Sequence, residues 1–383
     1  MLKFIFWSFL ASNILQVKAL FELKQCNSSG FNQNSASYLC KIHQNYSKLD
    51  FPLPTPCSIQ IDLRIQEIVE IDENHQLINV ILKLVMKWND TRISYEFNEN
   101  NKGSYFPWVL LDKAYISTLW RPNVHWSNSI KILKLPSLNQ NIIGSFWYNH
   151  PNHFFYQEYL QLSISCDMNF EKYPYDSHEC IMSLTNVIGN LELVNLQNPK
   201  IYGINETQNA DGNSFEAQND KLQFDILAEP LNSSFNSEFN TNYSKAQVKF
   251  YLKRKPRIIS NLLSSYYAPT SVLAFLSLIS FCIDPNVVPG RMGLLITLIL
   301  IITNTYNSID AAPNRGFSYV EIWYIGIIVP IFIGIIEYGV ILAMKKYGEK
   351  IDKHTLFQSI DIFTMIVCAI LLLFFNIIYW LSV

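Results

Sequence analysis

Small and polar side chains recur along one side of a long apolar segment, residues 290–309. As a helix, this segment would span about 30 Å, the thickness of the hydrocarbon core of a bilayer. The recurring residues are spaced by four, three, four and three positions, which places them on one helical face. They are Gly293, Thr297, Asn304 and Asn307, together with Leu300, the one apolar member of the stripe. Hydroxyl and amide groups in register suit a helix that lines a water-filled pore; packing against neighbouring helices is the alternative.

Three histidines and a carboxylate form a second group with possible chemistry: His125, His150, His153 and Glu158. Imidazole titrates near neutral pH and binds zinc together with carboxylates, so the group predicts a proton sensor or a metal site. Surface histidines without a function are the alternative, and the metal, if any, is unknown. The chain has no nucleotide-binding loop, HExxH motif or GxSxG motif. We therefore do not expect an enzyme or a cofactor.

The composition changes sharply along the 383 residues. The first 250 or so are polar and Asn-rich, whereas the remainder consists mostly of apolar runs. A net charge of −2 gives no indication of nucleic-acid binding. Residues 1–19 combine a basic start, an apolar stretch and a small-residue end, which predicts a signal peptide. Six N-x-S/T sequons precede the apolar part and predict glycosylation of an exported domain at Asn27, Asn45, Asn89, Asn205, Asn232 and Asn242.

These patterns predict an α+β membrane protein, with an N-terminal extracellular all-β sandwich followed by a four-helix transmembrane bundle. We expect an irregular leader at residues 20–57 and a sandwich of alternating apolar and polar strands at 58–256. The transmembrane domain follows at 257–383, with spans near 258–283, 290–309, 320–343 and 360–380. The short loop 344–359 is rich in lysine, which favours the cytoplasm and leaves both chain ends outside.

Five of the seven cysteines precede the apolar part, as expected for an oxidising compartment. Cys282 and Cys368 lie in predicted helices and are expected to be free. Because five is odd, one of the first three cysteines is either unpaired or bonded to another subunit. We expect a pairing of Cys26 with Cys40.

The segment CDMNFEKYPYDSHEC places thirteen residues between Cys166 and Cys180. On their own, its residues predict a turn with Pro174 as a candidate for a cis peptide bond, and a simple stapled hairpin is one interpretation. The segment resembles the signature of the Cys-loop receptors, the pentameric ligand-gated ion channels. Further matches follow in the family's order: WNDTRI at 88–93, LWRP at 119–122, LKR at 252–254, YAP at 267–269, LSLISF at 276–281 and VPGR at 288–291. The resemblance runs from about residue 58 to the end and is nearest to invertebrate members.

The resemblance implies a disulfide between Cys166 and Cys180, and a pore lined by the 290–309 helix of five chains. Leu300 matches the hydrophobic gate, although it could instead be an ordinary packing leucine. Selectivity is set near the cytoplasmic mouth, at Pro289, Gly290 and Arg291. Because no acidic residue stands there and Arg291 is cationic, we expect chloride selectivity. Asp310 at the outer mouth argues for cations, so a cation channel remains an alternative.

The resemblance also implies an agonist site between subunits. One subunit would contribute three loops, with His125 and Trp126, then Asn186 and its neighbours, then Phe239 and Tyr243. The neighbouring subunit would contribute Lys83, Val85, Tyr156 and Glu158. The second loop lacks the aromatic residue that amine-binding members use for a cation–π contact, which argues against an aminergic or GABA-like agonist.

Coupling between ligand site and pore is expected at Glu73, Tyr173, Pro174, Asp176 and Arg254, with Arg254 pairing with a carboxylate such as Asp176 or Glu73. The expected partners are four further subunits, identical or homologous, a small extracellular agonist (a transmitter, proton or metal ion) and the lipid bilayer. The expected location is a plasma membrane, including the postsynaptic one. A non-conducting subunit that needs a partner is a further alternative.

Overall fold

The computed structural model describes residues 46–96, 118–134, 150–203, 212, 214–217, 221–238, 241–284, 286–309, 317–347 and 353–383. It also describes the strand backbone at 21–26, 38–43 and 145–147. The chain divides into two compact units. The first consists of Met1–Asp167, Glu179–Asn219 and Ile226–Tyr251, and the second of Met168–His178, Asp220–Asp225 and Leu252–Val383.

The larger sheet of the first unit has seven strands. Its path is β11 (Val194–Leu196), β3 (Cys57–Asp72), β4 (Leu77–Asn89), β9 (His150–Ser165) and β7 (Ser129–Lys134). β12 (Lys200–Tyr202) pairs with β3, and β8 (Ser145–Trp147) pairs with β9. β3 and β4 alternate buried apolar residues with more exposed ones along most of their length, so one face of the sheet is covered.

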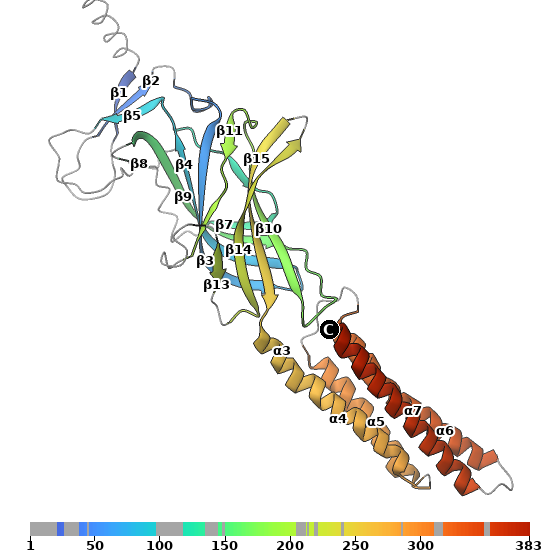
Figure 1. The fold of residues 1–383 in the computed structure, drawn as a ribbon. Helices are drawn as coiled ribbons and strands as arrows, with labels where there is room; N and C mark the ends of the chain where they lie inside the picture. The colour runs from blue at the N-terminus through green and yellow to red at the C-terminus, as the bar shows by residue number, and fades with distance from the viewer. Residues whose placement is uncertain are drawn as a thin grey trace, which may run out of the picture. The chain divides into compact units, whose positions relative to one another are not determined.

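The second sheet has five strands, in the order β13 (Phe215–Ala217), β14 (Phe224–Glu238), β15 (Thr241–Arg254), β10 (Ser177–Asn186) and β6 (Val124–Trp126). Buried side chains from both sheets form the core, among them Ile61, Leu82, Leu162, Met182 and Val248. Figure 1 shows these long strands in blue, green and yellow. The predicted β-sandwich is therefore confirmed.

The leader differs from the expectation. β1 (Phe21–Cys26), β2 (Tyr38–His43) and β5 (Ile93–Glu96) form a third, three-stranded sheet, so residues 20–57 are not uniformly irregular. Backbone pairing supplied by another part of the chain, β5, overrides the weak local periodicity of the leader. The predicted signal peptide and the Cys26–Cys40 side chains lie outside what the structure describes.

Four helices of the second unit are long and apolar enough to cross a membrane: Pro256–Cys282, Val288–Asn307, Tyr319–Lys345 and Leu356–Ser382. The first is built from α3 (Pro256–Leu262), a π-helical turn (Leu263–Tyr267), α4 (Ala268–Ile279) and a 3₁₀ turn (Ser280–Cys282). The other three are α5 (Val288–Asn307), α6 (Tyr319–Tyr347) and α7 (Lys353–Ser382). The π turn ends two residues before Pro269, which has no N–H to donate and so disrupts regular α-helical bonding.

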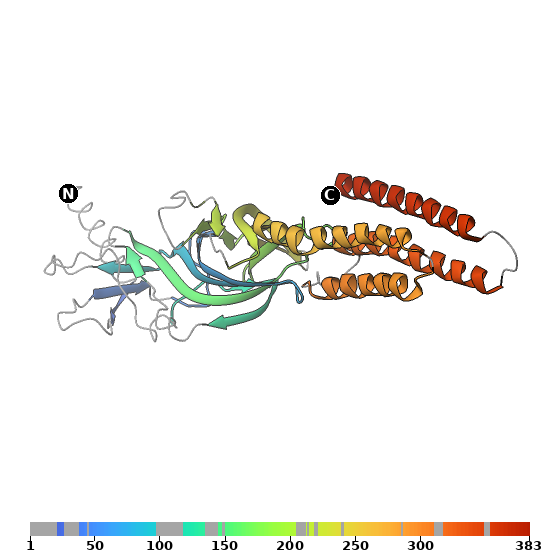
Figure 2. The same ribbon diagram turned by 90° about the horizontal axis from the view of Figure 1, so that it is seen from below.

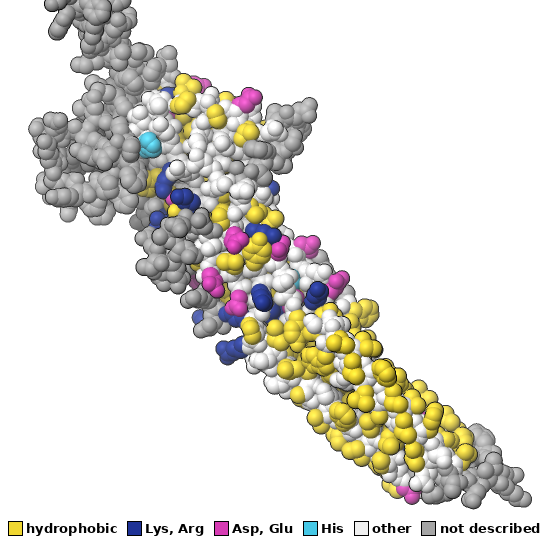
Figure 3. Space-filling model, viewed as in Figure 1, with side chains coloured by type: hydrophobic (Ala, Val, Ile, Leu, Met, Phe, Trp, Pro, Cys, Tyr) yellow, Lys and Arg dark blue, Asp and Glu magenta, His cyan; other side chains and the backbone are white. Residues whose placement is uncertain are grey.

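The four helices run side by side (Figure 2), with contacts between α4 and α5, α5 and α6, α4 and α6, and α6 and α7. Hydrophobic side chains gather over these helices on the face that Figure 3 shows. Phe275, Ile336 and Phe374 are each more than half exposed. Such a continuous apolar surface is what contact with lipid requires. The fold class predicted from the sequence is confirmed.

Candidate functional site

The polar stripe of α5 faces away from the rest of its own bundle. Gly293, Thr297, Asn304 and Asn307 are all exposed, and Leu300 has 56% of its surface exposed. The opposite face of α5 is buried through Leu295, Leu298 and Ile302. Thr297 donates its hydroxyl hydrogen to backbone carbonyls of the preceding turn, which leaves its oxygen lone pairs facing outward. A helix with its apolar side inside the bundle and its polar side outside needs water or further protein against that polar side.

Arg291 lies inside the bundle rather than at a pore mouth. Its side chain is fully buried, donating to Asp361 Oδ1 on α7 at 2.7 Å and to Glu337 Oε2 on α6 at 2.6 Å. Its guanidinium also lies 4.6 Å from the ring centre of Tyr338. The prediction that Arg291 presents its charge at the mouth is therefore wrong, because two carboxylates on neighbouring helices compensate it. Pro289 and Gly290 are exposed, and their place at a pore mouth stays a prediction.

The predicted pairing of Arg254 with Asp176 is present in the second unit. Arg254 Nε and Nη2 donate to the two carboxylate oxygens of Asp176 at 2.7 and 2.9 Å, and both side chains are buried. The guanidinium lies 4.7 Å from the ring centre of Tyr173 and 4.4 Å from that of Phe224. This is a bidentate ion pair enclosed by aromatic rings, a geometry that arginine provides and lysine does not.

The surroundings of this ion pair include one residue that the sequence analysis did not single out. His178 is buried between the rings of Phe170 and Phe224, and its Nε2 lies 2.6 Å from Asp176 Oδ2. Burial alone would raise the pKa of Asp176, but the hydrogen bonds with His178 and Arg254 outweigh it and lower that pKa to about 2. His178 stands two residues after Asp176, so strand alternation is the signal that could have found it.

The Cys166–Cys180 disulfide and the cis peptide at Tyr173–Pro174 are both present. Glu73 lies in the turn between β3 and β4, in the first unit, beside the exposed ion pair of Asp72 with His75. Cys57 is free, and its buried thiol lies 3.9 Å from the Asn89 carbonyl oxygen. Burial raises the pKa of that thiol to about 12, so Cys57 is poorly suited to a bond with another subunit.

The predicted first and second ligand loops meet on the outer face of the five-stranded sheet. His125 on β6 is paired with Thr185 on β10, and His125 is exposed. Tyr243 is partly exposed on β15, the strand that neighbours β10. Trp126 and Asn186 instead point inward, with exposed fractions of 5% and 1%. Phe239 lies outside the described residues.

Asn186 has a structural role in the second loop. Its amide group donates to the carbonyl oxygens of Ile188 and Gly189, at 2.9 and 2.7 Å. Gly189 itself has a φ of +94°, a conformation that side-chain-bearing residues rarely adopt. The side chain of Asn186 therefore shapes the loop rather than presenting itself to a ligand at the surface.

The strand register corrects the prediction that Tyr156 and Glu158 share a face with Lys83. Lys83 is paired with Tyr159, and Leu84 with Glu158. Residues directly opposite each other on antiparallel strands point to the same face, and the ammonium of Lys83 lies 5.4 Å from the ring centre of Tyr159. Tyr159 and, two residues earlier, Gln157 are therefore the outward neighbours of Lys83. The sequence of β9 alone could not show which of its residues point to the outer face.

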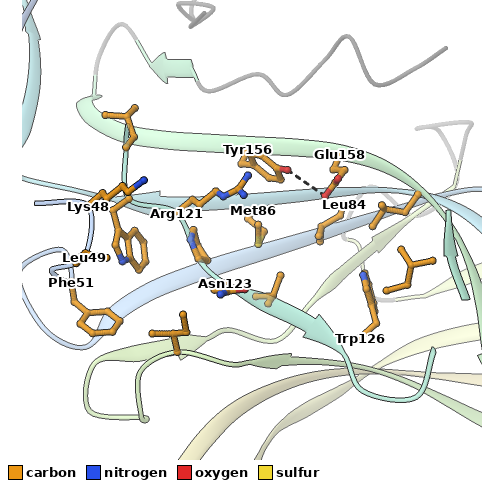
Figure 4. A pocket seen from close by; sticks show the side chains of 17 residues that line it. Lys48, Leu49, Phe51, Leu84, Met86, Arg121, Asn123, Trp126, Tyr156 and Glu158 are labelled. Carbon is orange, nitrogen blue, oxygen red and sulfur yellow. Dashed lines mark hydrogen bonds between the residues drawn. The ribbon is translucent and has the colours of Figure 1, made fainter. Parts of the chain in front are cut away.

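Tyr156 and Glu158 line a pocket of about 740 Å³ within the first unit, shown in Figure 4. Trp126, Arg121 and Lys48 also line it. Tyr156 donates to Glu158 Oε2 at 3.3 Å, and the guanidinium of Arg121 lies 5.8 Å from the ring centre of Tyr156. Burial, followed by the Glu158 charge, raises the pKa of Tyr156 to about 12, so its phenol stays protonated.

The predicted histidine site does not assemble. Among the described residues no group of three or more His, Cys, Asp or Glu side chains is placed to hold a metal ion. His153 and Glu158 stand five positions apart on β9, an odd number that turns them to opposite faces. His125 lies on the other sheet, and the side chain of His150 lies outside the described part of the chain.

Three sequon residues, Asn89, Asn232 and Asn242, are exposed as glycosylation requires, whereas Asn27, Asn45 and Asn205 lie outside the described residues.

Comparison with known proteins gives one family model and several distant relatives. The model of the neurotransmitter-gated ion-channel ligand binding domain matches residues 36–256. The chain is 24% identical over 302 residues to human gamma-aminobutyric acid receptor subunit rho-2, covering 77% of this chain and 60% of the relative. It is 21% identical over 316 residues to the serotonin-gated chloride channel mod-1 of Caenorhabditis elegans, covering 80% and 59%. It is 22% identical over 313 residues to the acetylcholine-gated chloride channel subunit acc-1 of the same organism, covering 80% and 62%.

Proposed function

Because this chain belongs to the neurotransmitter-gated ion-channel family, a family of Cys-loop receptor subunits rather than of enzymes, we propose that it is a subunit of a pentameric anion channel opened by a small extracellular ligand. The chain spans about 60% of the length of the relatives it matches. The observation that carries the proposal is the polar stripe of α5, which faces away from the buried side of the bundle.

Five copies of α5 around an axis would turn the stripes of all five toward shared water. Thr297 would then offer hydroxyl oxygens and Asn304 amide groups to permeating ions, and Leu300 would form the one apolar ring among them. A ring of exposed leucines closes a narrow pore by excluding water, which needs no moving plug. The 56% exposure of Leu300 in the single chain supports this role over that of a packing leucine inside the bundle.

Anion selectivity is supported by two observations that do not depend on Arg291. The first turn of α5 contains no acidic residue, and Gly290 is exposed near the helix start. Amide groups at a helix start favour anions when no carboxylate opposes them. In addition, two of the relatives are named as chloride channels. Asp310, which argues for cations, lies outside the described residues.

We assign the agonist site to the outer faces of both sheets. His125, Thr185 and Tyr243 would form one side of it, and Lys83 with Tyr159 on a second copy would form the other. Lysine and histidine on facing surfaces suit a ligand that carries a carboxylate or another acidic group. This assignment replaces Tyr156 and Glu158, which point into the sandwich.

The test is whole-cell current from cells that express this chain alone, at a plasma membrane shown to carry it by surface labelling. Transmitters, zinc and acid are applied in turn, and the reversal potential is read while external chloride is replaced. We expect a current that follows the chloride equilibrium potential. A current that follows sodium or potassium instead would establish the cation channel, and silence at every stimulus with protein at the surface would favour the partner-dependent subunit.

A further inference from the structure

Three hydroxyl groups on α5 and its C-cap donate their hydrogens to the helix itself. Thr297 donates to the carbonyl oxygens of two residues in the preceding turn, both at 2.8 Å. Thr305 donates to the carbonyl oxygen of Ile301, and Ser308 to that of Thr305, each at 2.8 Å. Serine and threonine in helices often bond to the backbone in this way. Because a hydroxyl group has a single hydrogen, these side chains offer only oxygen lone pairs to their surroundings.

Asn304 and Asn307 differ from the hydroxyl residues because their hydrogens remain available. Both side chains are exposed, and neither amide has a hydrogen-bond partner among the residues that the structure describes. Each primary amide carries two N–H donors. The structure describes all five residues of the polar stripe, and within the stripe only these two side chains have hydrogens left to donate.

The two asparagines lie next to each other and next to the proposed gate. Residues three apart are neighbours on a helix surface, so the two amides are separated by about 4.5 Å along the helix axis. Asn304 follows Leu300 by one turn, about 6 Å along the axis, and Asn307 lies further toward the C-terminal end of α5. In the proposed pentamer, five chains would form two rings of amides directly beside the ring of leucines.

An ion that reaches the leucine ring has to lose part of its hydration shell. Apolar side chains give the ion nothing in exchange, and a bare charge in such surroundings is strongly disfavoured. Polar groups that line a pore can replace the lost water, and whether they donate or accept hydrogens decides which ions they suit. Anions accept hydrogens, so amide N–H groups can replace this water, whereas the lone pairs of Thr297 cannot.

We propose that Asn304 and Asn307 form an anion-binding site beside the Leu300 gate, where their N–H groups replace water around a small monovalent anion such as chloride. This inference rests on the proposed function, because the two rings exist only if five chains surround a pore. It adds a second source of selectivity to the start of α5. The absence of a carboxylate near Gly290 avoids repulsion of anions, and the amide rings bind them.

Permeation through open channels tests the site in cells that express this chain alone. Leu300→Ser supplies the background, because a polar ring at the gate should hold the pore open without an agonist. Asn304→Thr and Asn307→Thr stay polar, but each new hydroxyl is expected to donate to the backbone as Thr297 does. Loss of one donor per chain should lower the single-channel chloride conductance by about threefold or more and reduce the chloride-to-sodium permeability ratio.

Two further variants separate the amide donors from polarity and from general damage. Asn304→Gln keeps a primary amide and should retain most of the chloride conductance. Thr305→Val is the matched control, since Thr305 stands beside Asn304 in the sequence but outside the stripe, with its hydrogen used within the helix. This control should conduct like the background channel.

The outcomes distinguish this site from the proposed function. Background channels that select sodium over chloride would overturn the proposed function, and the anion site with it. Background channels that select chloride, with Asn304→Thr and Asn307→Thr conducting like Thr305→Val, would overturn the site alone.

A structural measurement decides the case of channels that give no current. The two rings lie on the C-terminal side of the gate, the side predicted to be extracellular, so they remain open to solvent when the gate is closed. Crystals of the full-length chain grown in sodium iodide should give an anomalous peak on the pore axis between the rings of Asn304 and Asn307. The double variant Asn304→Thr, Asn307→Thr should give none. A wild-type crystal without the peak overturns the proposal.

Discussion

Replacing Arg254 by alanine removes the cation from the buried ion pair with Asp176, and the structure gives the size of the effect. The pKa of Asp176 is lowered from 3.8 to about 2. At about 1.4 kcal/mol per pKa unit, the ionised form of Asp176 is favoured in the fold by about 2 kcal/mol. This shift includes the hydrogen bond with His178, so Arg254 supplies part of it. Removing one partner also leaves a buried carboxylate, which typically costs about 3–5 kcal/mol.

We therefore expect Arg254→Ala to destabilise the protein by about 3 kcal/mol. At roughly 2 °C per kcal/mol, the melting midpoint of the solubilised protein should fall by about 6 °C. That change leaves enough folded protein to reach the cell surface, but the current evoked by the activating ligand should be lost. Arg254→Lys keeps the charge without the bidentate geometry, so it should give an intermediate melting point and a reduced current.

The pH dependence has a definite sign. Because the folded pKa of Asp176 is lower than the unfolded one, its contribution is complete above about pH 4 and is lost as the pH falls toward 2. Asp176→Asn should therefore make the melting midpoint depend less on pH between those values than it does in the wild type. Lys253→Ala is the matched control, since Lys253 is an exposed cation one position earlier. If Arg254→Ala melts and conducts like Lys253→Ala, the ion pair has no role in either stability or coupling and the reasoning is refuted.

Four further predictions concern the helices and the unpaired thiol. Leu300→Ser should wet the closed pore and give a holding current without any agonist, whereas an unchanged holding current would place the gate elsewhere. Gly290→Glu should add a ring of carboxylates and move the reversal potential away from the chloride equilibrium potential. An unchanged reversal potential would show that residue 290 does not set the selectivity. Arg291→Leu should lower the melting point more than Asp361→Asn, because it strands two buried carboxylates rather than neutralising one; the opposite ranking would contradict that account. Cys57→Ala should leave the oligomer unchanged on a non-reducing gel, while a lost band would reveal a bond between subunits.

The fold was predictable because its signals are local. Alternation over the long strands, four apolar segments and the loop from Cys166 to Cys180 each specify an element without reference to the rest of the chain. The Arg254–Asp176 pair was predictable because both residues lie in motifs shared with the resembled family, and the resemblance implies that these two motifs meet. The strands in the leader were not, because β2, which pairs with β1, has its other partner, β5, some fifty residues further along. The residue pattern of a six-residue segment does not indicate a pairing strand at that distance in the sequence.

Orientation within an element was harder to predict than the element itself. Arg291 opens a helix whose exposed stripe begins only two residues later, so the sequence allowed either a pore-facing or a buried side chain. Its direction is decided by Glu337 and Asp361, which stand on other helices at positions that carry no motif. A buried cation requires such carboxylates, whereas an exposed one does not. An acidic residue inside each of two apolar helices was the signal that could have indicated the burial of Arg291.

The parity of β9 has a consequence for the proposed agonist site. Consecutive residues of this one strand serve different surfaces, with Gln157 and Tyr159 on the outer face and Tyr156 and Glu158 on the inner one. Successive side chains of a β-strand point to opposite faces but share one backbone. A substitution of Glu158 therefore acts on the agonist site only through the backbone that positions Tyr159 opposite Lys83, whereas a substitution of Tyr159 acts on the outer face directly.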